Sequence, residues 1–150
     1  MTTLAANKLR TYHYAGDPIR EEYPAIAADI LFQGSAIGEN GSGYSRPLVA
    51  GDAFQGFAVA KADNAAGAAG DVKVTVEQKG FVTLPISGLG ITANDRPLVY
   101  ASDDDTFTLT AGSNSLIGTV SRWVSTGIAV VEFDAMWAAG ITAALAAAAA

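Results

Sequence analysis

Residues 71–78 read DVKVTVEQ, and this alternation decides the fold. Its three valines fall on one side of an extended chain, while the polar residues between them fall on the other side. The stretch is therefore predicted to be a strand with one wet face. Lys79-Gly80 follows directly, and FVTLPI comes next at 81–86, so we expect a hairpin with Pro85 at a sheet edge or bulge.

Two further runs support a β fold. IAVVEFD at 128–134 alternates again, with Glu132 and Asp134 on the polar side. FQGFAVA at 54–60 is apolar on both sides, which is typical of a central strand covered on both faces. Glycine, asparagine and aspartate clusters punctuate the chain between such runs. The pattern predicts an all-β fold, a small antiparallel β-barrel or β-sandwich, over residues 30–134.

The two ends of the chain differ from this body. Residues 1–29 show no sustained periodicity, and Pro18 and Pro24 favour extended backbone, so we expect an extended N-terminal arm. Residues 135–150 are rich in alanine and favour a short C-terminal helix, although Gly140 weakens it by about 1 kcal/mol. A helix packed on its own subunit or on a neighbour is the preferred interpretation, and a frayed end is the alternative.

Composition limits the function. The net charge is −6, and the nine lysines and arginines are scattered, so nucleic acid is not an expected partner. There is no cysteine, which excludes disulfides and thiolate chemistry. We expect no membrane span, because the alanine-rich tail is shorter than the roughly 20 residues needed. The N-terminal residues lack the apolar stretch of a secretory signal, so we expect no export by the usual route.

No motif predicts catalysis or a cofactor. His13 is the sole histidine, so neither a hydrolase triad nor a multi-histidine metal site is available. The run 103–105 is three aspartates and lacks the ligand spacing of a calcium loop, so we interpret it as a hairpin loop. The glycine-containing stretch 63–71 precedes a strand and lacks a phosphate-binding lysine, which indicates a loop. We therefore expect no enzyme, no metal and no cofactor.

The candidate partner-binding residues lie at the two ends of the chain. Tyrosine, tryptophan and arginine are enriched at the energetic centres of protein interfaces. In the tail, spacing by four would align the apolar side chains in one helical stripe. The candidates are Arg10, Tyr12, His13, Tyr14, Arg20 and Tyr23 in the arm, and Trp137, Ile141 and Leu145 in the tail. The alternative for the arm is that its tyrosines pack back on the β body of the same chain.

Two blocks of the sequence resemble a known family. RPLVAGDAFQGFAVAKADNAAGAAGDVKVTVEQKGFVTLPISGL spans 46–89, and VYASDDDTFTLTAGSNSLIGTVSRWVSTGIAVVEFDA spans 99–135. The order of G-D-x-F-x-G-F-A, N-x-x-G-x-x-G, V-x-V, V-Y-A-S-D-D-D-T-F and I-G-T-V-x-R-W resembles the capsid cement, or head decoration, proteins of tailed bacteriophages. The resemblance covers residues 23–135, and the alanine-rich tail matches no part of it.

The resemblance implies a structural virion protein on the outer surface of a capsid. Its partners would be the major capsid protein and itself, as a homotrimer, and it would stabilise contacts between capsid subunits without catalysis. It would be present in the host cytoplasm before assembly. The alternative is a carbohydrate- or host-surface-binding β-sandwich module, for which Trp123 and Trp137 are the candidate aromatic platforms.

Overall fold

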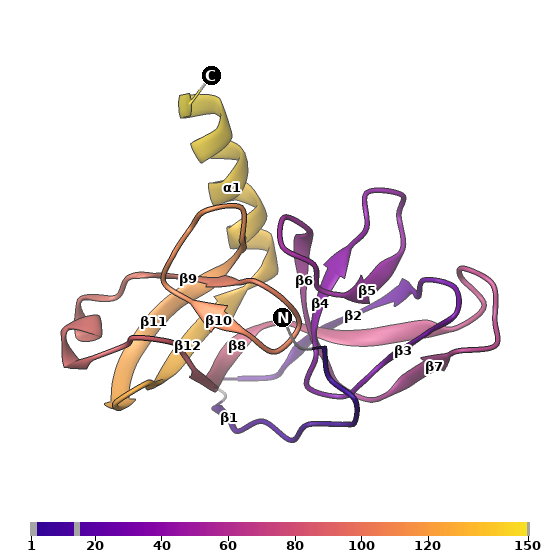
Figure 1. Ribbon diagram of the computed structural model, residues 1–150, viewed down its shortest axis with the longest axis horizontal. Coiled ribbons are helices and arrows are strands. Elements are labelled where there is room, and N and C mark those ends of the chain that lie inside the picture. The colour runs from indigo at the N-terminus through magenta and orange to yellow at the C-terminus, as the bar shows by residue number, and fades with distance from the viewer. Residues whose placement is uncertain (1–2, 14–15, 150) are drawn as a thin grey trace.

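The structure, a computed structural model, describes residues 3–13 and 16–149 and is mostly β (Figure 1). Ten strands form one curled antiparallel sheet, and two more form a small separate sheet. One α-helix, α1 (Ala135–Ala149), follows the last strand. The strands are β1 (Tyr12–His13), β2 (Ile19–Pro24), β3 (Asp29–Leu31), β4 (Ala36–Glu39), β5 (Ser45–Pro47), β6 (Ala53–Ala58), β7 (Ala62–Asn64), β8 (Lys73–Pro85), β9 (Leu98–Ala101), β10 (Phe107–Thr108), β11 (Ser115–Ser125) and β12 (Ile128–Asp134); a 3-10 helix, η1 (Ile91–Asp95), precedes β9.

Strand β8 pairs with four other strands of the sheet, and its length contradicts one prediction. The hairpin expected at Lys79-Gly80 is wrong, because the chain continues through both residues as a single strand of 13 residues. Its first part pairs with β2 and β6, and its second part pairs with β12 and β1. Partners along the whole strand hold it extended, and Lys-Gly is not one of the dipeptides that favour a two-residue hairpin.

Two hydrophobic clusters lie along β8. Val74 and Val76 belong to a cluster with β3, β4 and β7 residues, while Val82 and Leu84 belong to a larger cluster with β6, β11 and β12 residues. The predicted central strand is confirmed, because β6 lies between β4 and β8 in the sheet. The predicted alternation of β12 is also confirmed, since its Glu132 is exposed and its neighbours on both sides are buried.

The N-terminal arm is extended, but part of it belongs to the sheet. β1 pairs with Phe81 and Val82, and β2 pairs with the opposite end of β8. The expectation that these residues lie outside the strands is therefore wrong for β1 and β2. Sequence periodicity missed β2 because most of its side chains are exposed on both faces, which leaves no apolar alternation to detect.

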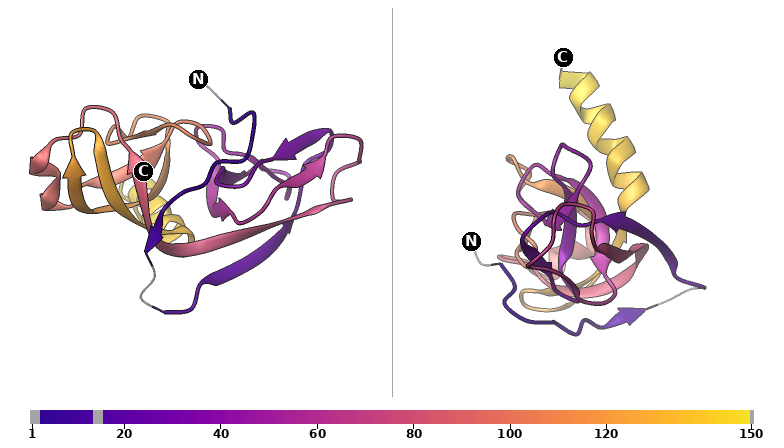
Figure 2. Two further views of the ribbon diagram at one scale, coloured as in Figure 1. Left: turned by 90° about the horizontal axis from the view of Figure 1, so that it is seen from below. Right: turned by 90° about the vertical axis from the view of Figure 1, so that its right-hand side faces the viewer.

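The predicted C-terminal helix is confirmed; its first turns pack on the β body and its far part projects beyond it. α1 begins at the residue after β12, with no linker between them. The Asp134 carboxylate accepts a hydrogen bond from the Trp137 backbone N–H at 3.1 Å, which caps the first turn. Figures 1 and 2 show the far part of the helix projecting away from the sheet.

Candidate binding surfaces

The Arg10 side chain is buried and makes its hydrogen bonds within its own subunit. Its side chain is only 2% exposed, and it donates hydrogen bonds to the Gly34 carbonyl and to the Asp105 carboxylate. The guanidinium also lies 5.4 Å and 5.3 Å from the ring centroids of Phe57 and Phe107. The expectation that Arg10 contacts a partner does not fit this burial, since a partner could reach the guanidinium only by displacing the residues around it.

The aromatic residues of the arm have different surroundings. Tyr12 packs against the larger core cluster, with its ring centroid 6.3 Å from that of Phe133. His13 is exposed, and its Nε2 lies 3.3 Å from the Thr83 hydroxyl. Tyr14 lies outside the described residues. Of Tyr12 and His13, His13 is therefore the more accessible to a partner.

Arg20 and Tyr23 sit on β2 against β8. The Arg20 guanidinium lies 3.2 Å from Glu77, which is 4% exposed although the alternation of its strand placed it on the wet face. The pairing of β2 with β8 places Arg20 opposite Glu77, and Arg20 supplies the charge partner of this buried carboxylate. The Tyr23 hydroxyl accepts a hydrogen bond from the Gln78 side-chain amide at 2.9 Å. Both candidates thus help to hold β2 on β8, and the Arg20 side chain is still 49% exposed.

The three aspartates form a hairpin loop, as predicted, and also hold the N-terminal segment. The loop joins β9 to β10, which pair antiparallel. Asp104 is 1% exposed, and its carboxylate accepts hydrogen bonds from the Ser35 hydroxyl at 2.9 Å and the Leu4 backbone N–H at 3.2 Å. Asp105 accepts hydrogen bonds from Lys8 at 2.9 Å and from Arg10 at 2.8 Å. We name this set of contacts the aspartate latch.

The two aspartates of the latch have opposite pKa shifts. Burial raises the pKa of Asp104 above its ordinary value; the Leu4 and Ser35 hydrogen bonds oppose this rise, and the charges of Asp103 and Asp105 add to it. Burial would also raise the pKa of Asp105, but its hydrogen bonds from Lys8 and Arg10 and their positive charges hold that pKa below its ordinary value. Sequence reasoning missed the latch because Lys8 and Arg10 lie about a hundred residues from the loop.

Replacing Asp104 with asparagine should flatten part of the pH dependence of stability. Because the folded pKa of Asp104 is above the unfolded value of 3.8, its ionised form destabilises the fold at neutral pH. That cost disappears as the pH falls through the raised pKa toward 3.8. We therefore expect Asp104→Asn to be at least as stable as the wild type at pH 7, and its advantage to shrink on acidification. Urea unfolding at several pH values measures the difference in stability between the variant and the wild type. If that difference favours the variant less at pH 7 than at pH 4, the raised pKa of Asp104 is contradicted.

All three tail candidates lie in α1, two in its first half and Leu145 in its second half. Trp137 and Ile141 pack against a small cluster formed by Tyr100, Leu116 and Ala138. Leu145 is 53% exposed. The predicted apolar stripe thus packs on its own subunit through its first two members and leaves the third about half exposed.

A groove of about 490 Å³ runs between α1 and the β body. One wall is the helix, through Thr142, Ala143, Leu145 and Ala146, and the other wall includes Phe54, Leu116 and the loop before β11. No residue of α1 is charged. An uncharged helix that is apolar on all sides is normally covered by other protein, so this groove is an apolar surface that the fold leaves open.

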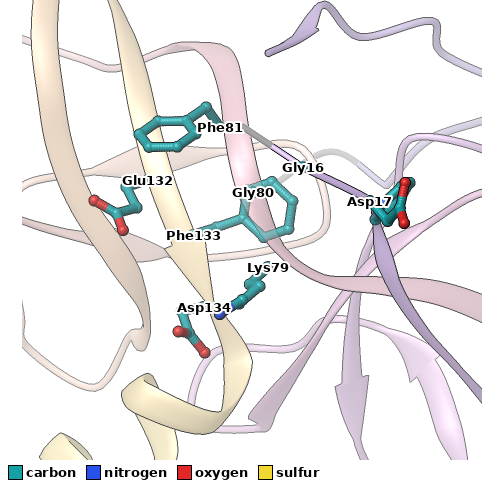
Figure 3. Close-up of a pocket in the computed structure, with 9 residues that line it drawn as sticks. Gly16, Asp17, Lys79, Gly80, Phe81, Glu132, Phe133 and Asp134 are labelled. Atoms are coloured by element: carbon teal, nitrogen blue, oxygen red, sulfur yellow. The ribbon is translucent and has the colours of Figure 1, made fainter. Parts of the chain in front are cut away.

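A second hollow, of about 290 Å³, lies between residues 16–18, which precede β2, and the paired strands β8 and β12 (Figure 3). Asp17 and Glu132 lie on opposite sides of it, and Lys79, Phe81 and Phe133 also line it. Its polar side chains are charged groups at the surface of the sheet. The arrangement contains no nucleophile with an adjacent base, so it gives no geometry for a reaction.

The remaining candidates are structural. Trp123 is partly buried against the larger core cluster, and its indole nitrogen is buried, so only part of its ring is open to a sugar. In the stretch 63–71, Asp63 and Asn64 end β7, and the rest lies in the loop that leads to β8. Among residues 3–13 and 16–149, no group of three or more histidines, cysteines, aspartates or glutamates is placed to hold a metal ion. No helix in that part of the chain is long and apolar enough to cross a membrane.

Comparison with known proteins gives no relative. No protein-family model matches the chain, and no curated protein and no solved structure matches it significantly. The case for a function therefore rests on the surfaces described above and on the resemblance of the sequence blocks.

Proposed function

We propose that this chain is a non-enzymatic structural virion protein that binds the outer surface of a bacteriophage capsid as a homotrimer. It would be made in the host cytoplasm, attach to the assembled shell and stabilise contacts between major capsid protein subunits. The observation that carries the proposal is the uncharged helix α1, whose far half is exposed beside an apolar groove. Exposed apolar surfaces of this kind mark sites of protein–protein contact.

The β body also suits this role. Pairing along the whole of β8 joins two core clusters into one sheet, which gives a stiff support for the helix. The helix presents its open side as a preformed apolar wall, so docking a partner in the groove would bury area without folding a new segment. Many copies binding a repeating shell need only a modest contact each, since avidity adds their effects.

The test mixes the purified protein with expanded empty shells of the major capsid protein encoded beside its gene and separates bound from free protein by sedimentation. We expect Ala143→Lys with Ala146→Lys to weaken shell binding about tenfold or more, because two charges would be buried in the apolar groove. The matched control is Ala144→Lys with Ala148→Lys, which changes residues that do not line the groove. The control should bind within about twofold of wild type.

Lysine is a good helix former, so both pairs of substitutions should preserve α1, which circular dichroism checks. Wild-type protein that stays in the supernatant at all shell concentrations would contradict the proposed function, and so would the lack of a capsid gene beside this one. Equal binding by the groove and control variants would mean that the groove side of α1 does not contact the shell.

A further inference from the structure

An exposed apolar tip lies at one end of the sheet. Ile91, Val124 and Ile128 are 61%, 41% and 38% exposed. The Asn94 side chain accepts a hydrogen bond from the Trp123 backbone N–H at 2.8 Å, which fastens η1 to the end of β11. We call residues 91–96 and 122–128 the tip. Figure 1 shows η1 and the β11–β12 turn at the same end of the molecule, far from β2.

The tip is positively charged on an acidic protein. Arg96, Arg122 and Asp95 give the tip a net charge of +1. The whole chain has a net charge of −6, so the residues outside the tip carry −7. Both arginines are exposed. Within the described part of the chain, neither makes an ion pair, whereas Lys8, Arg10, Arg20 and Arg46 all do. The tip therefore combines exposed aliphatic side chains with two uncompensated guanidinium groups.

A complementary surface lies on β2. Ile19 is 45% exposed, and Asp17, Glu21 and Glu22 are exposed beside it. We call these four residues the flank. Arg20 lies among them, but its guanidinium is occupied by Glu77. In the residues that the structure describes, β2 pairs only with β8, so its other edge is open. The flank thus offers an aliphatic side chain and carboxylates, the counterpart of the tip.

The two surfaces cannot meet within one subunit. Glu21 pairs with Val76 and Ile128 pairs with Pro85, so they lie at opposite ends of β8. Nine residues of extended chain separate those positions, which corresponds to about 30 Å. Ion pairs form within about 4 Å. A contact between tip and flank must therefore join two copies of the chain.

We infer that the tip of one copy docks on the open edge of β2 in the next, where Glu21 and Glu22 point to opposite faces of the strand, so that Arg96 and Arg122 meet one carboxylate each from the two sides of that edge. Such a head-to-tail contact uses two different surfaces, and it closes into a ring when the rotation between copies allows it. The inference rests on the proposed function in that it supplies the subunit contact of the proposed homotrimer. It assigns that contact to the ends of β8 and leaves the groove beside α1 free for the shell.

Analytical ultracentrifugation over a concentration series tests the contact by charge exchange. The tip variant is Arg96→Asn with Arg122→Glu; asparagine tolerates the left-handed backbone of position 96, where φ is 64°. The flank variant is Glu21→Lys with Glu22→Lys. Each variant alone should weaken self-association about tenfold or more, and the chain carrying all four substitutions should recover to within about threefold of wild type.

A control and a salt series complete the design. Lys61→Glu reverses an exposed charge that belongs to neither surface, and it should associate like wild type. Raising the salt concentration should weaken wild-type association, because exposed charges are screened. Thermal unfolding establishes that each variant is folded; should the four-substitution chain fail to fold, Arg122→Glu with Glu21→Lys replaces it, with the same expected recovery.

Three results would overturn the inference: a wild-type protein that is monomeric at every concentration, tip and flank variants that associate like wild type, or a four-substitution chain that stays dissociated. Shell sedimentation keeps this failure separate from failure of the proposed function. A protein that binds shells as a monomer refutes the tip-to-flank contact and the homotrimer but leaves the capsid role standing, whereas a ring that does not bind shells refutes only the capsid role.

Discussion

Replacing Phe57 with alanine is expected to lower the free energy of unfolding by about 3–5 kcal/mol, the largest loss from any single side chain of the core. Phe57 is fully buried, and its ring makes tilted or edge contacts with Phe54, Phe107 and Phe133 at centroid distances of 5.6, 6.0 and 4.9 Å. It also lies beneath the buried Arg10 guanidinium. Its removal would therefore leave a cavity and uncover a buried cation at once.

Urea unfolding followed by fluorescence measures this loss from the transition midpoint and slope. Leu9→Ala is the control, because Leu9 is 84% exposed and should change stability by no more than about 0.5 kcal/mol. A Phe57→Ala protein within about 1 kcal/mol of wild type would show that the aromatic cluster is not the centre of the core.

Replacing Asp105 with alanine is expected to cost about 3 kcal/mol, because it leaves the Arg10 guanidinium buried without its carboxylate. Asp105 is also the point where two cations of the N-terminal segment meet the loop before β10. The segment should then detach and become sensitive to protease. Limited proteolysis followed by mass spectrometry detects cleavage within residues 3–13, and urea unfolding gives the stability.

Lys8→Ala is the matched control for the aspartate latch. The Lys8 side chain is 40% exposed, so its ion pair with the same carboxylate is screened by water and should contribute less than about 1 kcal/mol. Equal losses for Lys8→Ala and Asp105→Ala would mean that burial of Arg10 does not matter. The pH dependence of Asp105 is opposite to that of Asp104, because its depressed pKa gives stability that is present above 3.8 and is lost as the pH falls below that value.

The sequence predicted strands where one face is wet. β12 has this pattern, and its exposed Glu132 between buried neighbours follows the alternation. The helix after it was also predictable, because alanine favours helix and nothing in the last turns opposes it. These features depend on residues close in sequence, so local reasoning reached them.

Features that depend on distant residues were not predictable. β8 continues through Gly80 because β12 and β2 supply partners along it, and neither partner is visible from the residues at the expected turn. Likewise, Arg10 was placed among the contact residues because arginine is common at interfaces, yet a loop far along the chain buries it. The tip was not predicted, because its aliphatic residues lie in η1 and at the ends of β11 and β12, and their exposure depends on how these separate segments pack together.

The direct junction between β12 and α1 determines how a load on the helix would travel. Asp134 ends the strand and caps the helix, so no flexible residue separates them. A force applied to the protruding end would pass through the Asp134–Ala135 peptide into a strand that is hydrogen-bonded on both sides, by β11 and β8. Because this junction has no hinge, pulling on the projecting end of α1 should strain the whole sheet together.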